Sequence, residues 1–202
     1  MPEAIHPTKL QIMEAAISLF SRKGFNGTTT KEIAQEAGIA EGTIFRHYTN
    51  KLEILYGMTD SLMPLIGVET LKKAIEESSQ MDAGQALEHI IRNRFELISA
   101  GRDVLRIILV EMQYDSHLRE VYIERVYKPI VKMIREFFSE RMRSGEFREA
   151  NPNLLTSMMF STILMAISNQ YFLGDAAKTV EPGDLADIFL NGIGREESHE
   201  EN

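Results

Sequence analysis

The side chains of Thr43, Arg46 and His47 have the types and spacing of groups that contact DNA. Hydroxyl, guanidinium and imidazole groups donate hydrogen bonds to base edges and phosphate oxygens. Because the apolar Ile44 and Tyr48 are interspersed with them, we expect one short helix to bury its apolar side and present the polar groups outward. A helix of this kind can enter the major groove of double-stranded DNA.

The preceding residues predict the element that supports this helix. Thr29 and Glu32 have the spacing of a capping box, so a helix is expected to begin at Thr30. Gly38 stands where a helix commonly ends in a left-handed residue. Two short helices around such a turn predict a helix-turn-helix, although a capped helix followed by glycine is also common in helical proteins with purely structural roles.

A third short helix is predicted after Asn50, which can cap it, with Glu53 three residues later. Lys51 then lies in the first turn, where backbone N–H groups and the positive helix end attract a phosphate. The sequence therefore predicts one helix that reads bases and a following helix that holds the DNA backbone.

Residues 9–55 resemble the DNA-binding domain of the TetR (tetracycline-repressor) family of transcriptional regulators. The resemblance is carried, in order, by residues 15–20, 23–25, 28–30, 33–34, 37–39, 42–43 and 51. Ala40 departs from the usual capping serine, and Phe45 from a frequent tyrosine. The expected DNA contacts are the base-reading Thr43 and Arg46, the phosphate-binding Thr29, Thr30, His47 and Lys51, and Phe45 against a sugar or a thymine methyl group.

The charge of the chain is unevenly distributed. The net charge is −8 over 202 residues. Residues 1–51 carry six Lys or Arg against five Asp or Glu, whereas residues 52–202 carry sixteen against twenty-five. We expect a DNA-binding domain at 1–51, a helical ligand-sensing and dimerisation domain at 52–192, and a disordered acidic tail at 193–202. The affinity for DNA should depend on placed contacts and on dimer avidity more than on bulk charge.

The remainder of the chain predicts helices and no strand, giving an all-α protein of about nine helices. The expected helices are 51–74 with a bend at Pro64, 83–100, 102–113, 116–144 with a kink at Pro129, 152–172 and 182–192.

The helix at 152–172 is apolar on nearly every side, and a helix of this kind must be buried on every side. One face of this helix can pack within its own subunit, and the other can be covered by a second molecule. The alternative is that the helix is buried entirely within the core of its own chain. The resemblance implies a homodimer in which the last two helices of each subunit form a four-helix bundle. The expected interface residues are Met158, Leu164, Met165, Leu185, Ile188 and Phe189.

Methionine and aromatic side chains are frequent after residue 57, where nine of the eleven methionines lie. Methionine fills irregular spaces and adapts to guests, although an ordinary core has the same composition. The resemblance implies a pocket for a mostly apolar small molecule between these helices. Its expected lining is Met58, Leu62, Met63, Phe95, Met112, Tyr122, Tyr127, Met133, Met159, Ile163 and Asn169.

Several classes of protein are disfavoured by the sequence. The absence of cysteine excludes disulfides and thiolate metal sites, and the five histidines are scattered without ligand spacing. We therefore expect no enzyme activity, metal or cofactor. Nothing at the N-terminus resembles a signal peptide and no apolar run is long enough to span a membrane, so a cytoplasmic protein without membrane contact is expected.

These observations predict a ligand-responsive transcriptional regulator, most simply a repressor released from a pseudo-palindromic operator by its ligand. The predicted helix 51–74 carries Lys51 at its DNA end and Met58 and Met63 towards the pocket, so it can couple the two sites. Activation by the ligand, a constitutive or architectural DNA-binding protein and an all-α enzyme remain as alternatives.

Overall fold

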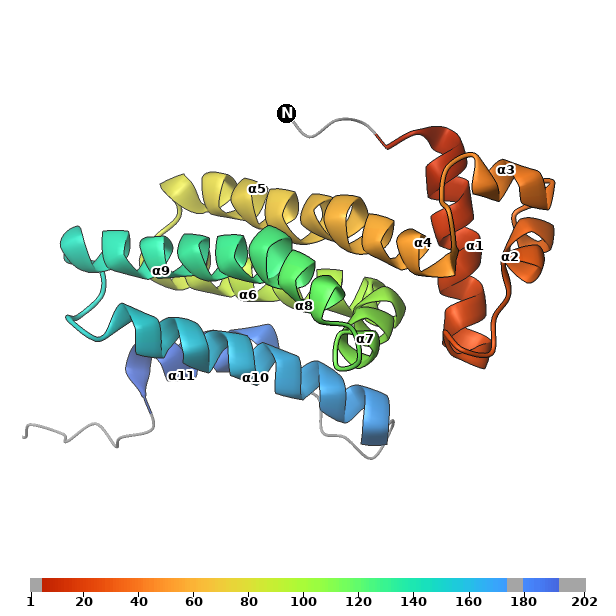
Figure 1. Ribbon diagram of the computed structural model, residues 1–202. Coiled ribbons are helices and arrows are strands. Elements are labelled where there is room, and N and C mark those ends of the chain that lie inside the picture. Colours follow the sequence, from red (N-terminus) through yellow and green to blue (C-terminus); the bar gives the residue numbers. More distant parts are fainter. Residues whose placement is uncertain (1–4, 174–179, 193–202) are drawn as a thin grey trace, which may run out of the picture. The chain divides into compact units, whose positions relative to one another are not determined.

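The computed structural model describes residues 5–173 and 180–192, except for the side chains of 65–66 and 166–173. Within this part of the chain all regular structure is helical (Figure 1). If helices that continue through a π-helical or 3-10 turn are counted as one, the described residues form nine helices. The predictions of an all-α fold and of about nine helices are confirmed.

By its packing the chain divides into two compact units, and the first comprises Met1–Lys72 and Leu97–Met133. This unit begins with a three-helix head, which we define as α1 to α3. Its helices are α1 (Pro7–Lys23), α2 (Thr30–Glu36), α3 (Glu41–Phe45), α4 (Lys51–Gly57), α7 (Arg102–Glu111) and α8 (Ser116–Tyr122).

The second unit comprises Lys73–Glu96 and Ile134–Asn202. Its helices, some of which begin or end in the first unit, are α5 (Thr70–Glu77), α6 (Ala83–Ala100), α9 (Lys128–Arg143), α10 (Pro152–Leu173) and α11 (Pro182–Asn191). The predicted helix limits agree with these to within two residues, except that the helix predicted at 51–74 continues to Gln80. Residues 193–202, the predicted tail, lie outside the described residues.

Pro64 and Pro129 interrupt two long helices without ending them, as predicted. A proline has no N–H to donate, and its ring displaces the carbonyl four residues earlier. The structure accommodates this with π-helical turns at Met58–Leu62 and Leu65–Glu69 around Pro64, and at Ile123–Tyr127 before Pro129. The wider turns allow the backbone to pair again, so each helix continues past its proline.

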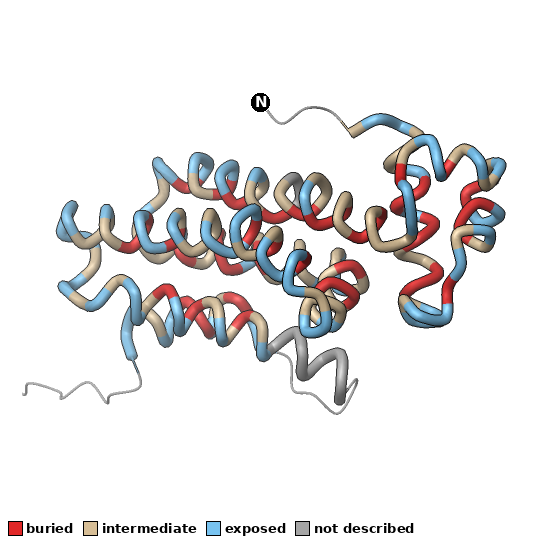
Figure 2. The backbone as a smooth tube through the Cα atoms, viewed as in Figure 1, coloured by how far each residue is buried: buried red, intermediate tan, exposed pale blue. Residues whose placement is uncertain are grey.

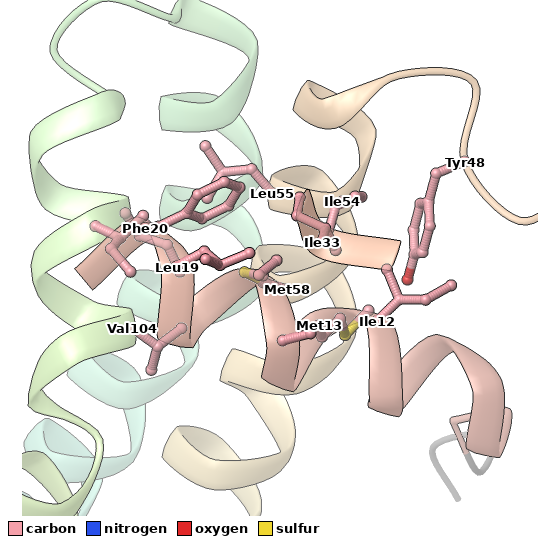
Figure 3. Close-up of a cluster of buried hydrophobic side chains, with 14 of the residues drawn as sticks. Ile12, Met13, Leu19, Phe20, Ile33, Tyr48, Ile54, Leu55, Met58 and Val104 are labelled. Carbon is pink, nitrogen blue, oxygen red and sulfur yellow. The ribbon is translucent and has the colours of Figure 1, made fainter. Parts of the chain in front are cut away.

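The hydrophobic core of the first unit extends beyond the head (Figure 3). Phe20 of α1 and Ile33 of α2 are buried in it, together with Met58, which follows α4. Val104 of α7 belongs to the same cluster. Because such an interior is close-packed, α4 and α7 cannot shift without repacking the head.

The second unit has a core of its own, which aromatic side chains dominate at one end. Phe138 lies against Phe137, Phe147 and Phe189, with ring centroids 5.7 to 6.3 Å apart. Arg141 of α9 donates hydrogen bonds to the carbonyls of Ser78 and Met81, at 2.9 and 3.2 Å. Buried positions line one side of the helices (Figure 2). None of the described helices is long and apolar enough to cross a membrane.

The turn between α1 and α2 requires a glycine at position 27. A Cβ atom there would lie 2.5 Å from the Lys23 carbonyl oxygen, which is backbone and cannot turn aside. We expect Gly27→Ala to lower the free energy of unfolding by about 1–3 kcal/mol in urea titrations. Gly42→Ala is the control, because nothing lies within 4 Å of a Cβ there and a helical alanine should stabilise by up to about 1 kcal/mol. Equal unfolding midpoints for the two variants would contradict this account of the turn.

Candidate nucleic-acid interface

The capping box predicted at the start of α2 is present. The Glu32 backbone N–H donates to Thr29 Oγ1 at 3.2 Å, and the Thr29 N–H donates to Glu32 Oε2 at 2.9 Å. The Lys23 ammonium group, with the Thr29 donors, lowers the pKa of Glu32 to about 2. Gly38 has a φ of +66°, so the chain leaves α2 through a glycine in the left-handed conformation that the sequence predicted.

The recognition helix α3 is held at its start in a way that the sequence did not predict. Ala40 provides no side-chain cap, as expected. Glu41 instead accepts a hydrogen bond from Thr30 Oγ1 at 2.8 Å, which joins the start of α3 to the start of α2. The Thr30 hydroxyl, predicted to contact phosphate, therefore has a protein partner in the free molecule.

The outer face of α3 carries the predicted base-reading pair. Arg46 and Phe45 are exposed, whereas Ile44 and Tyr48 are buried. Arg46 Nη2 donates to Thr43 Oγ1 at 3.0 Å, so the two side chains predicted to read bases lie together. Burial of the apolar side of α3 fixes which way this pair points, since a rotated helix would expose Ile44.

Lys51 of α4 is half-buried, and its ammonium group contacts the head in the free protein. Its Nζ donates to the carbonyl oxygens of Phe25 and Thr28, at 2.5 and 2.7 Å, and lies 4.4 Å from the Phe25 ring centroid. Burial lowers the pKa of this ammonium group. The predicted phosphate ligand thus also joins α4 to the turn between α1 and α2, a role for which its sequence spacing gave no signal.

Residues 12–56 match the model of the bacterial regulatory proteins of the tetR family, and residues 63–176 match that of the C-terminal region of YsiA-like proteins. The HTH-type transcriptional regulator YvkB of Bacillus subtilis is 34% identical over 193 residues, which cover 94% of this chain and 98% of YvkB. The chain belongs to the TetR family. It is a DNA-binding transcriptional regulator of the helix-turn-helix type.

One further relative and one solved structure are similar to most of this chain. The fatty acid metabolism regulator protein of Bacillus subtilis is 25% identical over 158 residues, 78% of this chain and 80% of that protein. The crystal structure of FadR from Bacillus subtilis in complex with stearoyl-CoA has a TM-score of 0.74 at 22% identity, covering 92% of this chain and 99% of that one. This structural likeness shows that the TetR-type fold is shared along most of the chain.

Polar contacts join α1 to α7 and α4 to α8 within the first unit of this TetR-family regulator. Arg106 Nη2 of α7 donates to the Ser21 carbonyl oxygen of α1 at 3.1 Å. Tyr56 of α4 donates to Asp115 Oδ2 at 2.9 Å, and Asp115 Oδ1 accepts from the Leu118 N–H at the start of α8. Sequence reasoning missed these links, and only the capping position of Asp115 gave a local signal for one of them.

The residues predicted to line the ligand pocket lie in both units. In the first unit Met58, Met63 and Tyr122 are buried, whereas Leu62, Met112 and Met133 are half-buried and Tyr127 is exposed. In the second unit Met159 and Ile163 are buried and Phe95 is half-buried. The side chain of Asn169 lies outside the described residues. Met58 belongs to the core that the head shares with α7.

The second unit also buries a charged side chain that sequence reasoning did not single out. Arg94 of α6 is 4% exposed, and its Nε donates to Asn93 Oδ1 at 3.1 Å. Burial lowers the pKa of this guanidinium group to about 10. No group of three His, Cys, Asp or Glu side chains among the described residues could hold a metal ion.

The predicted interface residues of α10 and α11 divide into an outer and an inner set. Met158, Met165 and Ile188 are 49%, 62% and 49% exposed. Leu164 and Phe189 are half-buried, and Leu185 is buried within its own chain. The exposed residues Met158 and Met165 give α10 an apolar outer face, as expected of a helix that is apolar on nearly every side. Ile188 adds an exposed apolar side chain on α11.

Proposed function

We propose that this regulator is a homodimeric repressor that leaves a pseudo-palindromic operator when it binds a long-chain acyl-CoA. The observation that carries the proposal is the core that the head shares with α4, α7 and α8 (Figure 3). The acyl-CoA class is supported by a relative named as a fatty acid metabolism regulator and by the stearoyl-CoA of the FadR complex. Buried, adaptable side chains such as Met58 and Met63, both in the first unit, suit an acyl chain.

The coupling follows from close packing. A ligand that displaces α4 or α8 must also displace the head, since Met58 packs with α1 residues and Tyr56 is hydrogen-bonded to Asp115. Two heads must fit half-sites about 34–36 Å apart, so a small displacement of each prevents simultaneous docking. We divide the functions as the sequence predicted, with DNA binding in 1–51 and ligand binding and dimerisation in 52–192.

Titrations with and without ligand test this proposal. An operator duplex is first selected from a random-sequence pool with the protein and labelled for fluorescence anisotropy. Stearoyl-CoA should lower the affinity for operator about 5- to 150-fold. In calorimetry, saturating operator should lower the affinity for stearoyl-CoA by the same factor. Free CoA, which lacks the acyl chain, is the control. Stearoyl-CoA that binds equally well with and without operator would refute the coupled repressor.

Arg46 provides a test of base reading. If its guanidinium group contacts a guanine edge, Arg46→Ala should weaken binding to the selected operator by about 1–3 kcal/mol and relax the preference at one base pair. Arg22→Ala is a matched control, because Arg22 is an exposed arginine of α1 that pairs with Glu36 at 2.9 Å. Equal losses on operator and random DNA for Arg46→Ala would refute the base contact.

A further inference from the structure

Two histidines that are far apart in the sequence lie together beside the recognition helix. The ring centroids of His6 and His47 are 5.3 Å apart. His6 is the N-cap of α1, and its Nδ1 accepts a hydrogen bond from the Thr8 N–H at 3.2 Å. In the neutral ring Nε2 therefore carries the hydrogen and is a donor. His47 directly follows Arg46, the C-terminal cap of α3.

The surroundings of this pair are positively charged. Partial burial lowers the pKa of His47, and the nearby charges of His6, Lys9 and Arg46 lower it further. Lys9 Nζ also lies 5.9 Å from the ring centroid of Tyr48, the residue after His47. The free protein thus gathers several donors at one point of the head and disfavours the charged form of the imidazole there.

We propose that a backbone phosphate of the operator binds against His6 and His47, and that DNA binding is coupled to proton uptake at His47. The inference rests on the proposed DNA-binding mode. The pair lies next to Arg46, so a duplex read by α3 brings its backbone close to these rings. A phosphate is complementary to this cluster, because its negative charge offsets the positive charges of Lys9 and Arg46 and favours the protonated form of His47.

The sign of the coupling follows from proton linkage. In the free protein the pKa of His47 lies below its ordinary value, and an adjacent phosphate raises it. At pH values between the pKa of His47 in the free protein and its pKa in the complex, the complex therefore binds more protons than the free protein. The affinity for operator consequently increases as the pH falls through this range. For a dimer with two pairs we expect operator affinity to rise about tenfold from pH 8 to pH 6.

Anisotropy titrations of the selected operator duplex from pH 6 to pH 8, at constant ionic strength, measure this slope. His47→Gln removes the titration and keeps a hydrogen-bonding side chain. His6→Asn removes the other imidazole and keeps an oxygen that can cap α1. His47→Gln should show a flatter dependence on pH than the wild type, with the main loss of affinity at pH 6. His6→Asn should weaken binding, because one of the two rings proposed to contact the phosphate is lost. Lys31→Gln is the charge control, because Lys31 is an exposed lysine of α2 that is not one of the charges acting on His47, so the slope should not change.

The outcomes separate this inference from the proposed function. NMR titration of the imidazole signals should show a higher pKa for His47 in the complex than in the free protein. A wild-type pH dependence in His47→Gln, or wild-type operator affinity in His6→Asn, would overturn the histidine site alone. A wild-type protein that binds no duplex at any pH would overturn both proposals.

Discussion

Ile188→Glu is expected to convert the protein to monomers and to weaken operator binding about 10²- to 10⁴-fold, the range over which two linked sites exceed one. Ile188 lies on the exposed apolar face of α11, half exposed in the single chain. If this face is covered by a second copy, a carboxylate there must be buried without a partner in each subunit. Sedimentation velocity measures the first effect and anisotropy the second.

The choice of position follows from the structure. Phe189 is the neighbouring apolar residue, but its ring stacks on Phe138 within the same chain, so a charge there would damage the subunit itself. Ile188→Met is the matched control, because it keeps an apolar side chain and should remain dimeric. A dimer that persists in Ile188→Glu with full operator affinity would place the interface on another surface.

Lys51→Met is expected to lower the free energy of unfolding by about 2–3 kcal/mol and to weaken binding to all DNA sequences alike. The substitution removes two charge-assisted hydrogen bonds, to the Phe25 and Thr28 carbonyl oxygens, while leaving an apolar chain over the Phe25 ring. Both carbonyls then lose their ammonium donor. If Lys51 also binds phosphate, the slope of log affinity against log salt concentration should decrease by about one for each head.

Urea titrations and anisotropy at several salt concentrations separate the two roles of Lys51. Lys31→Met is the control for stability, since Lys31 is an exposed lysine of α2 and surface substitutions change stability by about 0.5 kcal/mol or less. Wild-type stability in Lys51→Met would show that the two carbonyl contacts contribute nothing to the fold. Full stability loss with an unchanged salt dependence would instead assign Lys51 to the fold alone.

Local interactions allowed the sequence to predict most of the helices. The Thr29–Glu32 capping box and Gly38 act within a few residues of one another, so α2 begins and ends where the pattern places it. Pro64 and Pro129 act on their own helices in the same way. The outward side of α3 could also be predicted, because the burial of Ile44 and Tyr48 follows from their helical spacing.

The partners of charged and polar side chains were decided by the tertiary structure. Lys51 meets the Phe25 carbonyl across 26 residues, Tyr56 meets Asp115 across 59, and His6 lies against His47. A hydrogen bond or ring contact between distant segments depends on where the fold brings them, and spacing along one helix carries no signal for it.

The sequence by itself determined most helix boundaries, the exposed face of α3 and the family resemblance, since each depends on residues that are close in the chain. The tertiary structure alone decided that the head shares its core with α7 and α8, and that Leu185 is buried while Ile188 is exposed. The reason is that an apolar side chain is equally suited to a subunit core, a pocket or an interface, and only packing against other helices assigns it to one of them.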